Sequence, residues 1–185
     1  MNTIVTSKEE LLKTSRELIQ REGWSAVNIR SVASACGVSV GSIYNYFDSK
    51  AALLTATVES VWCEICHRPE DGAVFQDTLA CLTWLYGRME YGGQQYPGFF
   101  NLHSLGFLGV DKSDGKRRMQ QTWQHITDGL RAVLRRDTKI RPDAFTEQFT
   151  VENFADLLFS LMLSALLRQD YDPTTVLELV RRTLY

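Results

Sequence analysis

The sequence predicts an all-α protein, with a small N-terminal helix-turn-helix domain over residues 1–50 and a larger helical domain over residues 51–185. Apolar residues recur with the period of an α-helix through nearly every segment, and no segment alternates convincingly between polar and apolar residues as a half-buried strand does. Two short amphipathic helices joined at a glycine lie between about Asn28 and Phe47. That pairing is typical of the helix-turn-helix unit.

The first helix is predicted to begin after Ser7 and to end at Gly23. Ser7 and Glu10 have the spacing of a capping box, which bonds the free backbone N–H groups of a first turn. Leu11 and Leu18 then lie on one apolar stripe, and a glycine is the commonest residue where a helix ends.

The next two helices are predicted over Asn28–Cys36, capped by Asn28, and Val40–Phe47, capped by Ser39. Gly37 supplies the positive φ that the tight turn between them requires. Ile43 and Phe47, four residues apart, lie on one face and anchor the second helix to a core.

The rest of the chain is predicted to be helical as well. Asp48 is expected to cap a long helix that runs to about His67, and a loop over 91–98 separates the next helix from an aromatic segment. The later helices are expected over about 75–89, 119–133 and Pro142–Arg168, and from Asp172-Pro173 to the last residues.

Composition bounds the class of protein without identifying it. Hydrophobic residues make up 44% and charged residues 23%, as in an ordinary soluble protein, and the net charge of −2 is not that of a polycation. The first residues lack a signal peptide, and the longest apolar run, Phe154–Leu167, is shorter than the roughly 20 residues of a membrane span. We therefore expect a cytoplasmic protein, without membrane contact and with reduced cysteines.

The second short helix is predicted to read DNA, because in this docking mode it enters the major groove. Its outer face presents small or polar residues that suit close approach to base edges: Val40, Gly41, Ser42 and Asn45. Asn45 is a candidate to pair with an adenine edge. The hydroxyls of Tyr44 and Tyr46 are candidates for phosphate contacts, and Lys50 and Arg30 supply positive charge nearby.

The run Gly37-Val38-Ser39-x-Gly41, followed by Tyr44-x-Tyr46-Phe47-x-x-Lys50, resembles the DNA-binding domain of the TetR family, and the resemblance covers about residues 7–55. It implies a double-stranded DNA operator as partner, and a remainder of the chain that binds a small-molecule effector and forms a homodimer. It also implies DNA contacts at these positions: Asn28, Arg30, Ser39, Val40, Gly41, Ser42, Tyr44, Asn45, Tyr46 and Lys50.

The segment from Phe154 to Leu167 is apolar nearly all round, which predicts a helix that is buried on more than one side. One face can serve the core of the chain and another a partner subunit, although a helix buried inside a monomer has the same pattern. We expect the dimer interface to include Phe154, Leu158, Leu161, Ala165, Leu177 and Val180.

The centre of the chain is rich in aromatic residues and methionine, and a mostly apolar cavity with a few polar groups is the usual form of a small-molecule site. An apolar or aromatic effector is therefore expected, in contact with Trp84, Met89, Phe100, His103, Phe107 and Trp123. The competing interpretation is that each of these residues simply belongs to the core.

Cys63-Glu64-Ile65-Cys66-His67 has the spelling of a c-type haem attachment motif. Haem attachment accompanies export, for which no signal is seen, and zinc needs further ligands at a spacing that is missing. We therefore expect no cofactor and no metal, and two ordinary helix residues at Cys63 and Cys66. A redox- or metal-responsive regulator that uses Cys63, Cys66 and His67 remains the alternative.

Together these features predict a DNA-binding transcriptional regulator, a repressor that a small, largely apolar effector releases from a palindromic operator. A nucleophile elbow, a phosphate loop and an HExxH motif are all missing, so an enzyme is not expected. The long helix 48–67 is the expected route of the signal, since it leaves the DNA-binding domain.

Overall fold

The computed structural model describes residues 6–66, 72–100 and 112–185, with side chains from residue 123 onward in the last range. All regular structure in these ranges is helical, which confirms the predicted fold class. Two units pack separately: the first comprises residues 6–66 with Gly92–Phe99, and the second comprises residues 72–91, Phe100 and 112–185.

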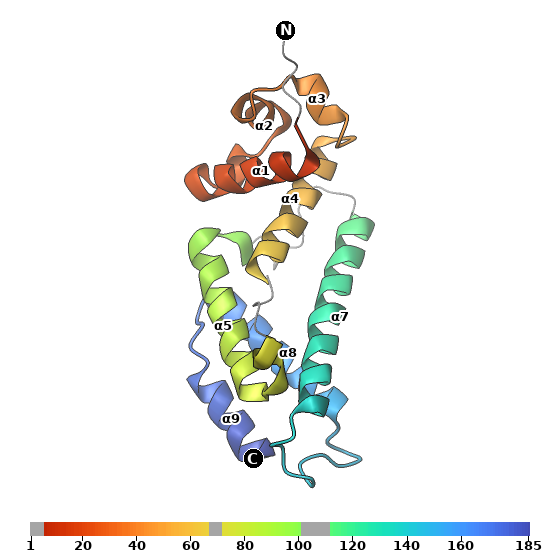
Figure 1. The fold of residues 1–185 in the computed structure, drawn as a ribbon, viewed down its shortest axis with the longest axis vertical. Helices are drawn as coiled ribbons and strands as arrows, with labels where there is room; N and C mark the ends of the chain where they lie inside the picture. Colours follow the sequence, from red (N-terminus) through yellow and green to blue (C-terminus); the bar gives the residue numbers. More distant parts are fainter. Residues whose placement is uncertain (1–5, 67–71, 101–111) are drawn as a thin grey trace. The chain divides into compact units, whose positions relative to one another are not determined.

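The first unit is built around α1 and α4, and its elements are α1 (Lys8–Glu22), η1 (Trp24–Ala26), α2 (Ile29–Ala35), α3 (Val40–Tyr44) and α4 (Lys50–Ile65) (Figure 1). The hydroxyl of Ser7 accepts the Glu10 N–H at 3.1 Å, and Gly23, at φ +82°, ends the helix, as predicted. Helix α1 contacts both α2 and α4, and the buried side chains between them include Leu11, Ile19, Val32, Leu53 and Val61.

Helix α4 is capped by Ser49 and not by Asp48, which corrects the predicted cap. The Ser49 hydroxyl accepts the backbone N–H of Ala52 at 3.1 Å from an extended conformation, φ −156° and ψ 166°. A cap residue directly precedes the first helical residue, and α4 begins at Lys50, so only position 49 has the required geometry. The helix lies wholly in the first unit, beyond the boundary at residue 50 that we expected.

The second unit contains η2 (Gly72–Gln76), α5 (Thr78–Gln95), α7 (Lys112–Arg136), α8 (Val151–Arg168) and α9 (Thr174–Leu184). Its core joins α5, α7, α8 and α9 through Leu82, Tyr86, Leu130, Phe154, Leu158 and Val180. The expected helix through Phe75 is interrupted, because the Asp77 carboxylate accepts the Ala80 N–H at 2.8 Å and so starts α5 afresh.

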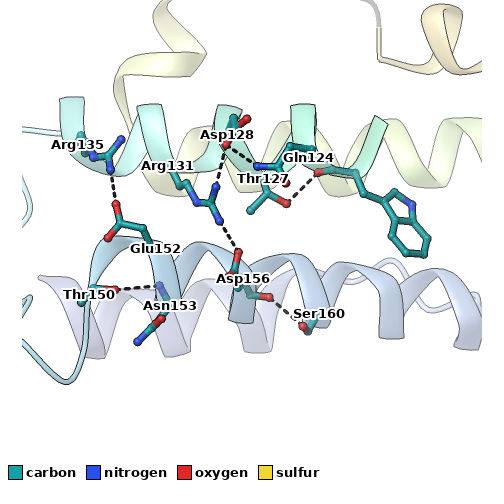
Figure 2. Close-up of polar contacts among 11 residues, drawn as sticks. Gln124, Thr127, Asp128, Arg131, Arg135, Thr150, Glu152, Asn153, Asp156 and Ser160 are labelled. Atoms are coloured by element: carbon teal, nitrogen blue, oxygen red, sulfur yellow. Dashed lines mark hydrogen bonds and ion pairs between the residues drawn. The ribbon is translucent and has the colours of Figure 1, made fainter. Parts of the chain in front are cut away.

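Helices α7 and α8 lie side by side, and ion pairs join their exposed edges (Figure 2). The Arg131 guanidinium bonds Asp128 at 2.8 Å on its own helix and Asp156 at 2.9 Å on α8. Arg135 pairs with Glu152 one turn away. These contacts fix the register of the two helices more than they stabilise them, since exposed pairs contribute about 0–1 kcal/mol each.

The long helix that the sequence predicts from Pro142 begins only at Val151, nine residues later. Pro142 lies instead in a turn, closed by the Ala144 N–H on the carbonyl of Arg141 at 3.1 Å. The Thr150 hydroxyl caps α8 by accepting the Asn153 N–H at 3.1 Å. Proline suits the second position of a turn as well as the first turn of a helix, so its presence alone does not distinguish them.

Candidate nucleic-acid interface

The turn between α2 and α3 has the geometry that the sequence predicts. The Asn28 side chain accepts the N–H groups of Arg30 and Ser31, both at 3.0 Å, and the Ser31 hydroxyl accepts the Asn28 N–H at 3.1 Å. Gly37 adopts φ +67°, a conformation that is strained for a residue with a Cβ. The start of α2 and the turn that follows it are therefore both fixed by local hydrogen bonds and backbone conformation.

Helix α3 is anchored on one side and open on the other. Ile43 is fully buried and Phe47 is nearly so, whereas the side chains of Val40 and Tyr44 are 41% and 51% exposed. The Ser39 hydroxyl accepts the Ser42 N–H at 3.1 Å and caps the helix as predicted. The helix is shorter than expected, because a turn begins at Asn45, but the candidate contact residues remain on its exposed side.

The side chain of Tyr46 is exposed, but it also holds the start of α1 in place. Its hydroxyl donates to the backbone carbonyl of Thr6 at 2.5 Å and so ties the start of α1 to the end of the helix-turn-helix. The ammonium group of Lys8 lies 5.8 Å from the centre of the Phe47 ring, beside the same junction. Lys8 is a cation at this surface that sequence reasoning missed, since the contact spans about forty residues and leaves no local pattern.

Of the remaining polar candidates, one already forms hydrogen bonds within the chain, and two are exposed cations. The Asn28 oxygen is used twice in capping α2, so that side chain first of all holds the fold. Arg30 and Lys50 are exposed, and within the part of the chain that the structure describes neither forms an ion pair. Two exposed cations, one before and one after α3 in the sequence, that form no ion pair among the described residues are suited to phosphate contacts.

The expected effector residues pack in different local environments, and two of them, His103 and Phe107, lie outside the described residues. Met89 is part of the core of the second unit. Among the described rings, the other three aromatic residues have these contacts, with centroid distances of 5.4 Å for Trp84 and Phe75, 6.4 Å for Phe100 and Tyr171, and 5.8 Å for Trp123 and Phe159.

Four of the six expected interface residues are buried inside their own chain, namely Phe154, Leu158, Ala165 and Val180, each at most 3% exposed. They have no free surface for a partner, which corrects the prediction for these four. Leu161 and Leu177 are half-buried. The large apolar side chains exposed on α8 and α9 are Leu157, Leu167 and Leu179.

The structure describes only part of the cysteine segment. Cys63 is exposed and Cys66 half-buried near the end of α4, while His67 lies outside the described residues. Across residues 6–66, 72–100 and 112–185, no three His, Cys, Asp or Glu side chains are grouped to hold a metal ion. Within the same ranges, no helix is long and apolar enough to cross a membrane.

The capped α2, the positive-φ turn and the half-exposed α3 define a helix-turn-helix module of the class that DNA-binding regulators use. The sequence model described as "Bacterial regulatory proteins, tetR family" matches residues 7–57. Residues 7–57, which contain the helix-turn-helix, are therefore similar to the DNA-binding domain of TetR-family regulators.

The chain is also similar to individual regulators and to a solved structure. The chain is similar to the uncharacterized HTH-type transcriptional regulator YerO of Bacillus subtilis (44% identity over 52 residues, 28% of this chain and 18% of YerO). It is also similar to the HTH-type transcriptional repressor KstR of Mycobacterium tuberculosis (28% over 107 residues, 57% of this chain and 49% of KstR). The crystal structure of a putative TetR-family transcriptional regulator from Rhodococcus sp. shares the fold, with a TM-score of 0.64 at 18% identity over 96% of this chain and 97% of that one. The chain thus spans less than half the length of these two sequence relatives.

Proposed function

We propose that the chain is a dimeric repressor that binds a palindromic operator through α3 and is released by a small, largely apolar effector. The observation that carries the proposal is the two-sided character of α3. Ile43 and Phe47 fix its position in the core, and Val40 and Tyr44 are left open to the major groove. The similarity to a named repressor, KstR, supports the direction of regulation.

DNA binding is tested by fluorescence anisotropy on duplexes that the protein selects from a randomised library. Tyr44→Ala and Lys50→Ala should each weaken binding, and Lys50→Ala should lower the salt dependence by about one phosphate contact. Arg136→Ala is the matched control, because it removes one positive charge from α7 in the other unit. The proposal fails if the wild type enriches no duplex, or if the control weakens binding as much as Lys50→Ala.

A homodimer would place two copies of α3 about one turn of DNA apart, roughly 34 Å, as a palindrome requires. The surface proposed for the contact lies on α8 and α9, where Leu157, Leu167 and Leu179 are exposed. Leu157→Glu should convert the dimer to a monomer in sedimentation experiments without unfolding it, since the side chain is 43% exposed. Ala132→Glu, which places the same charge on an exposed position of α7, should remain dimeric.

The core of the second unit contains one group that supports an effector site. The ring of Tyr86 is almost fully buried, and its hydroxyl has no hydrogen-bond partner among the described residues. A buried hydroxyl without a partner costs stability unless an external molecule satisfies it. We infer that a largely apolar effector with one hydrogen-bonding atom would pair with this hydroxyl.

The effector is sought in an organic-solvent extract of the source cells, added to the protein–operator complex. Release of the wild type by the extract, together with a weaker response of Tyr86→Phe at equal operator affinity, supports the proposal. Equal release of both proteins contradicts the role of Tyr86. An extract that releases neither protein contradicts the effector itself.

A further inference from the structure

Gly41, the second residue of α3, is a glycine that the backbone does not require. Positive φ values occur at Gly23, Gly37 and Gly98 among the described glycines, and Gly41 is absent from that group because it has helical geometry. Glycine is among the least favourable residues within a helix. Its presence therefore has another cause than conformation.

Packing among the described residues does not require this glycine either. A Cβ built at position 41 would meet only the hydroxyl oxygen of Ser39 among the described residues, at 3.6 Å, which is ordinary van der Waals contact. An alanine would fit there without moving a neighbour. The remaining reason for a bare backbone is close approach from outside the chain.

The surface around Gly41 indicates what approaches. Val40 precedes it and is 41% exposed, so the start of α3 presents two valine methyl groups beside an uncovered Cα. This end of a recognition helix meets the edges of base pairs in the major groove. The apolar group on those edges is the C5-methyl of thymine, which apolar side chains contact.

We propose that Val40 and Gly41 together read the methyl group of a thymine in the operator, with Val40 as the contacting side chain and Gly41 as the gap that admits the methyl. This inference rests on the proposed DNA binding through α3. Val40 and Gly41 then recognise a specific base although neither has a hydrogen-bonding side chain. The absence of a Cβ at Gly41 contributes to that specificity.

The test uses a duplex that the wild type selects from a randomised library, in which each thymine is replaced in turn by deoxyuridine. Loss of one methyl contact should weaken wild-type binding about fourfold at one position of the half-site. Gly41→Ala should weaken binding to the thymine duplex about fivefold or more, because its Cβ occupies the place of the methyl. On the deoxyuridine duplex the penalty of Gly41→Ala should shrink, since the added carbon then fills the vacated space.

Gly87→Ala and Gly129→Ala are matched controls, because both glycines are exposed on helices and a Cβ there would meet no described atom within 4 Å. All three alanine variants should melt at or above the wild-type temperature, and both controls should bind DNA as the wild type does. The inference is overturned if Gly41→Ala binds as well as the controls, or if no deoxyuridine position weakens the wild type. If the wild type selects no duplex at all, the proposed DNA binding fails first and this inference fails with it.

Discussion

Replacing the buried carboxylate of Asp137 by an amide is the sharpest test of the fold of the second unit. Asp137 is 5% exposed and accepts the N–H groups of Thr78 at 2.8 Å and Lys139 at 3.0 Å, as well as the hydroxyl of Tyr185. One side chain thus joins the end of α7 to the start of α5 and to the residue after α9. Asp137→Asn keeps the shape but turns an N–H donor toward groups that are themselves donors.

The expected loss in the free energy of unfolding follows from these three hydrogen bonds. A hydrogen bond to a charged group contributes about 1.5–3 kcal/mol, and the amide oxygen can replace only part of what the carboxylate accepts. We expect Asp137→Asn to lower the free energy of unfolding by about 2–4 kcal/mol at neutral pH. Tyr185→Phe, which removes one donor, should cost about 1–2 kcal/mol.

The pH dependence gives an independent check on the charge of Asp137. Burial alone would raise the pKa of this carboxyl, but the bonds from Tyr185, Thr78 and Lys139 outweigh it and hold the pKa below its ordinary value. A depressed folded pKa stabilises the protein above the unfolded pKa of about 3.9, and that stability is lost as the pH falls through the folded value. The deficit of Asp137→Asn relative to the wild type should therefore shrink as the pH falls below about 4.

The assay is urea unfolding followed by circular dichroism at neutral and acidic pH. Other carboxylates titrate in both proteins and cancel in the difference. Asp143→Asn is the matched control, because the Asp143 side chain is 86% exposed, and it should change stability by less than about 0.5 kcal/mol. A deficit of Asp137→Asn that is the same at both pH values would refute the proposed role of the charge.

Three further predictions concern single side chains. Phe99→Ala should destabilise the first unit by about 3–5 kcal/mol, because Phe99 is buried and stacks on Trp24 at 5.4 Å; an unchanged urea midpoint of tryptophan fluorescence would contradict this. Asn28→Ala should cost about 1 kcal/mol of stability, whereas Asn28→Ser should keep both the cap and operator affinity; loss of affinity in the serine variant alone would show that Asn28 touches DNA directly. Burial raises the pKa of the Cys81 thiol to about 11, so iodoacetamide should alkylate exposed Cys63 much faster than Cys81 in the folded protein, as mass spectrometry of the peptides can show; equal rates would argue that α5 is not packed as described.

Local spacing predicted the helix-turn-helix well, because the forces that build it act over three or four residues. Ser7, Asn28 and Ser39 cap the helices that they were expected to cap, and Gly37 has the positive φ that the turn needs. Asp48 failed as a cap by a single residue, since Ser49 has an equally suitable oxygen. Which of two adjacent polar residues caps a helix depends on how the helix packs against its neighbours. The spacing of residues in the sequence does not define that packing.

Burial by distant partners was harder to predict. The apolar pattern of α8 indicated a helix buried on several sides, but it did not show that Phe154 and Leu158 face their own chain. An apolar residue looks the same in sequence whether its partner is α5, α9 or a second subunit. The half-buried Leu161 and the exposed Leu157 are distinguished only once the neighbouring helices are in place.

The end of α5 and the residues that follow it, Gly92–Phe99, belong to the first unit, whereas the earlier part of the helix belongs to the second. Tyr96-Pro97-Gly98-Phe99 forms a tight turn, with the Phe99 N–H on the Tyr96 carbonyl at 3.0 Å and Gly98 at φ +80°, the pattern of a type II turn. The turn directs both aromatic rings into the first unit, where the Tyr96 hydroxyl donates to Glu64 at 2.8 Å.

The Glu64 carboxylate also pairs with the Arg16 guanidinium at 2.7 Å. This one side chain of α4 therefore bonds both α1 and the residue that follows α5. Earlier residues of the same helix, such as Tyr86 and Met89, belong to the core of the second unit. Helix α4, by contrast, lies entirely in the first unit. Helix α5 thus begins in the core of the second unit and ends directly before Tyr96, whose hydroxyl bonds Glu64 of α4 in the first unit.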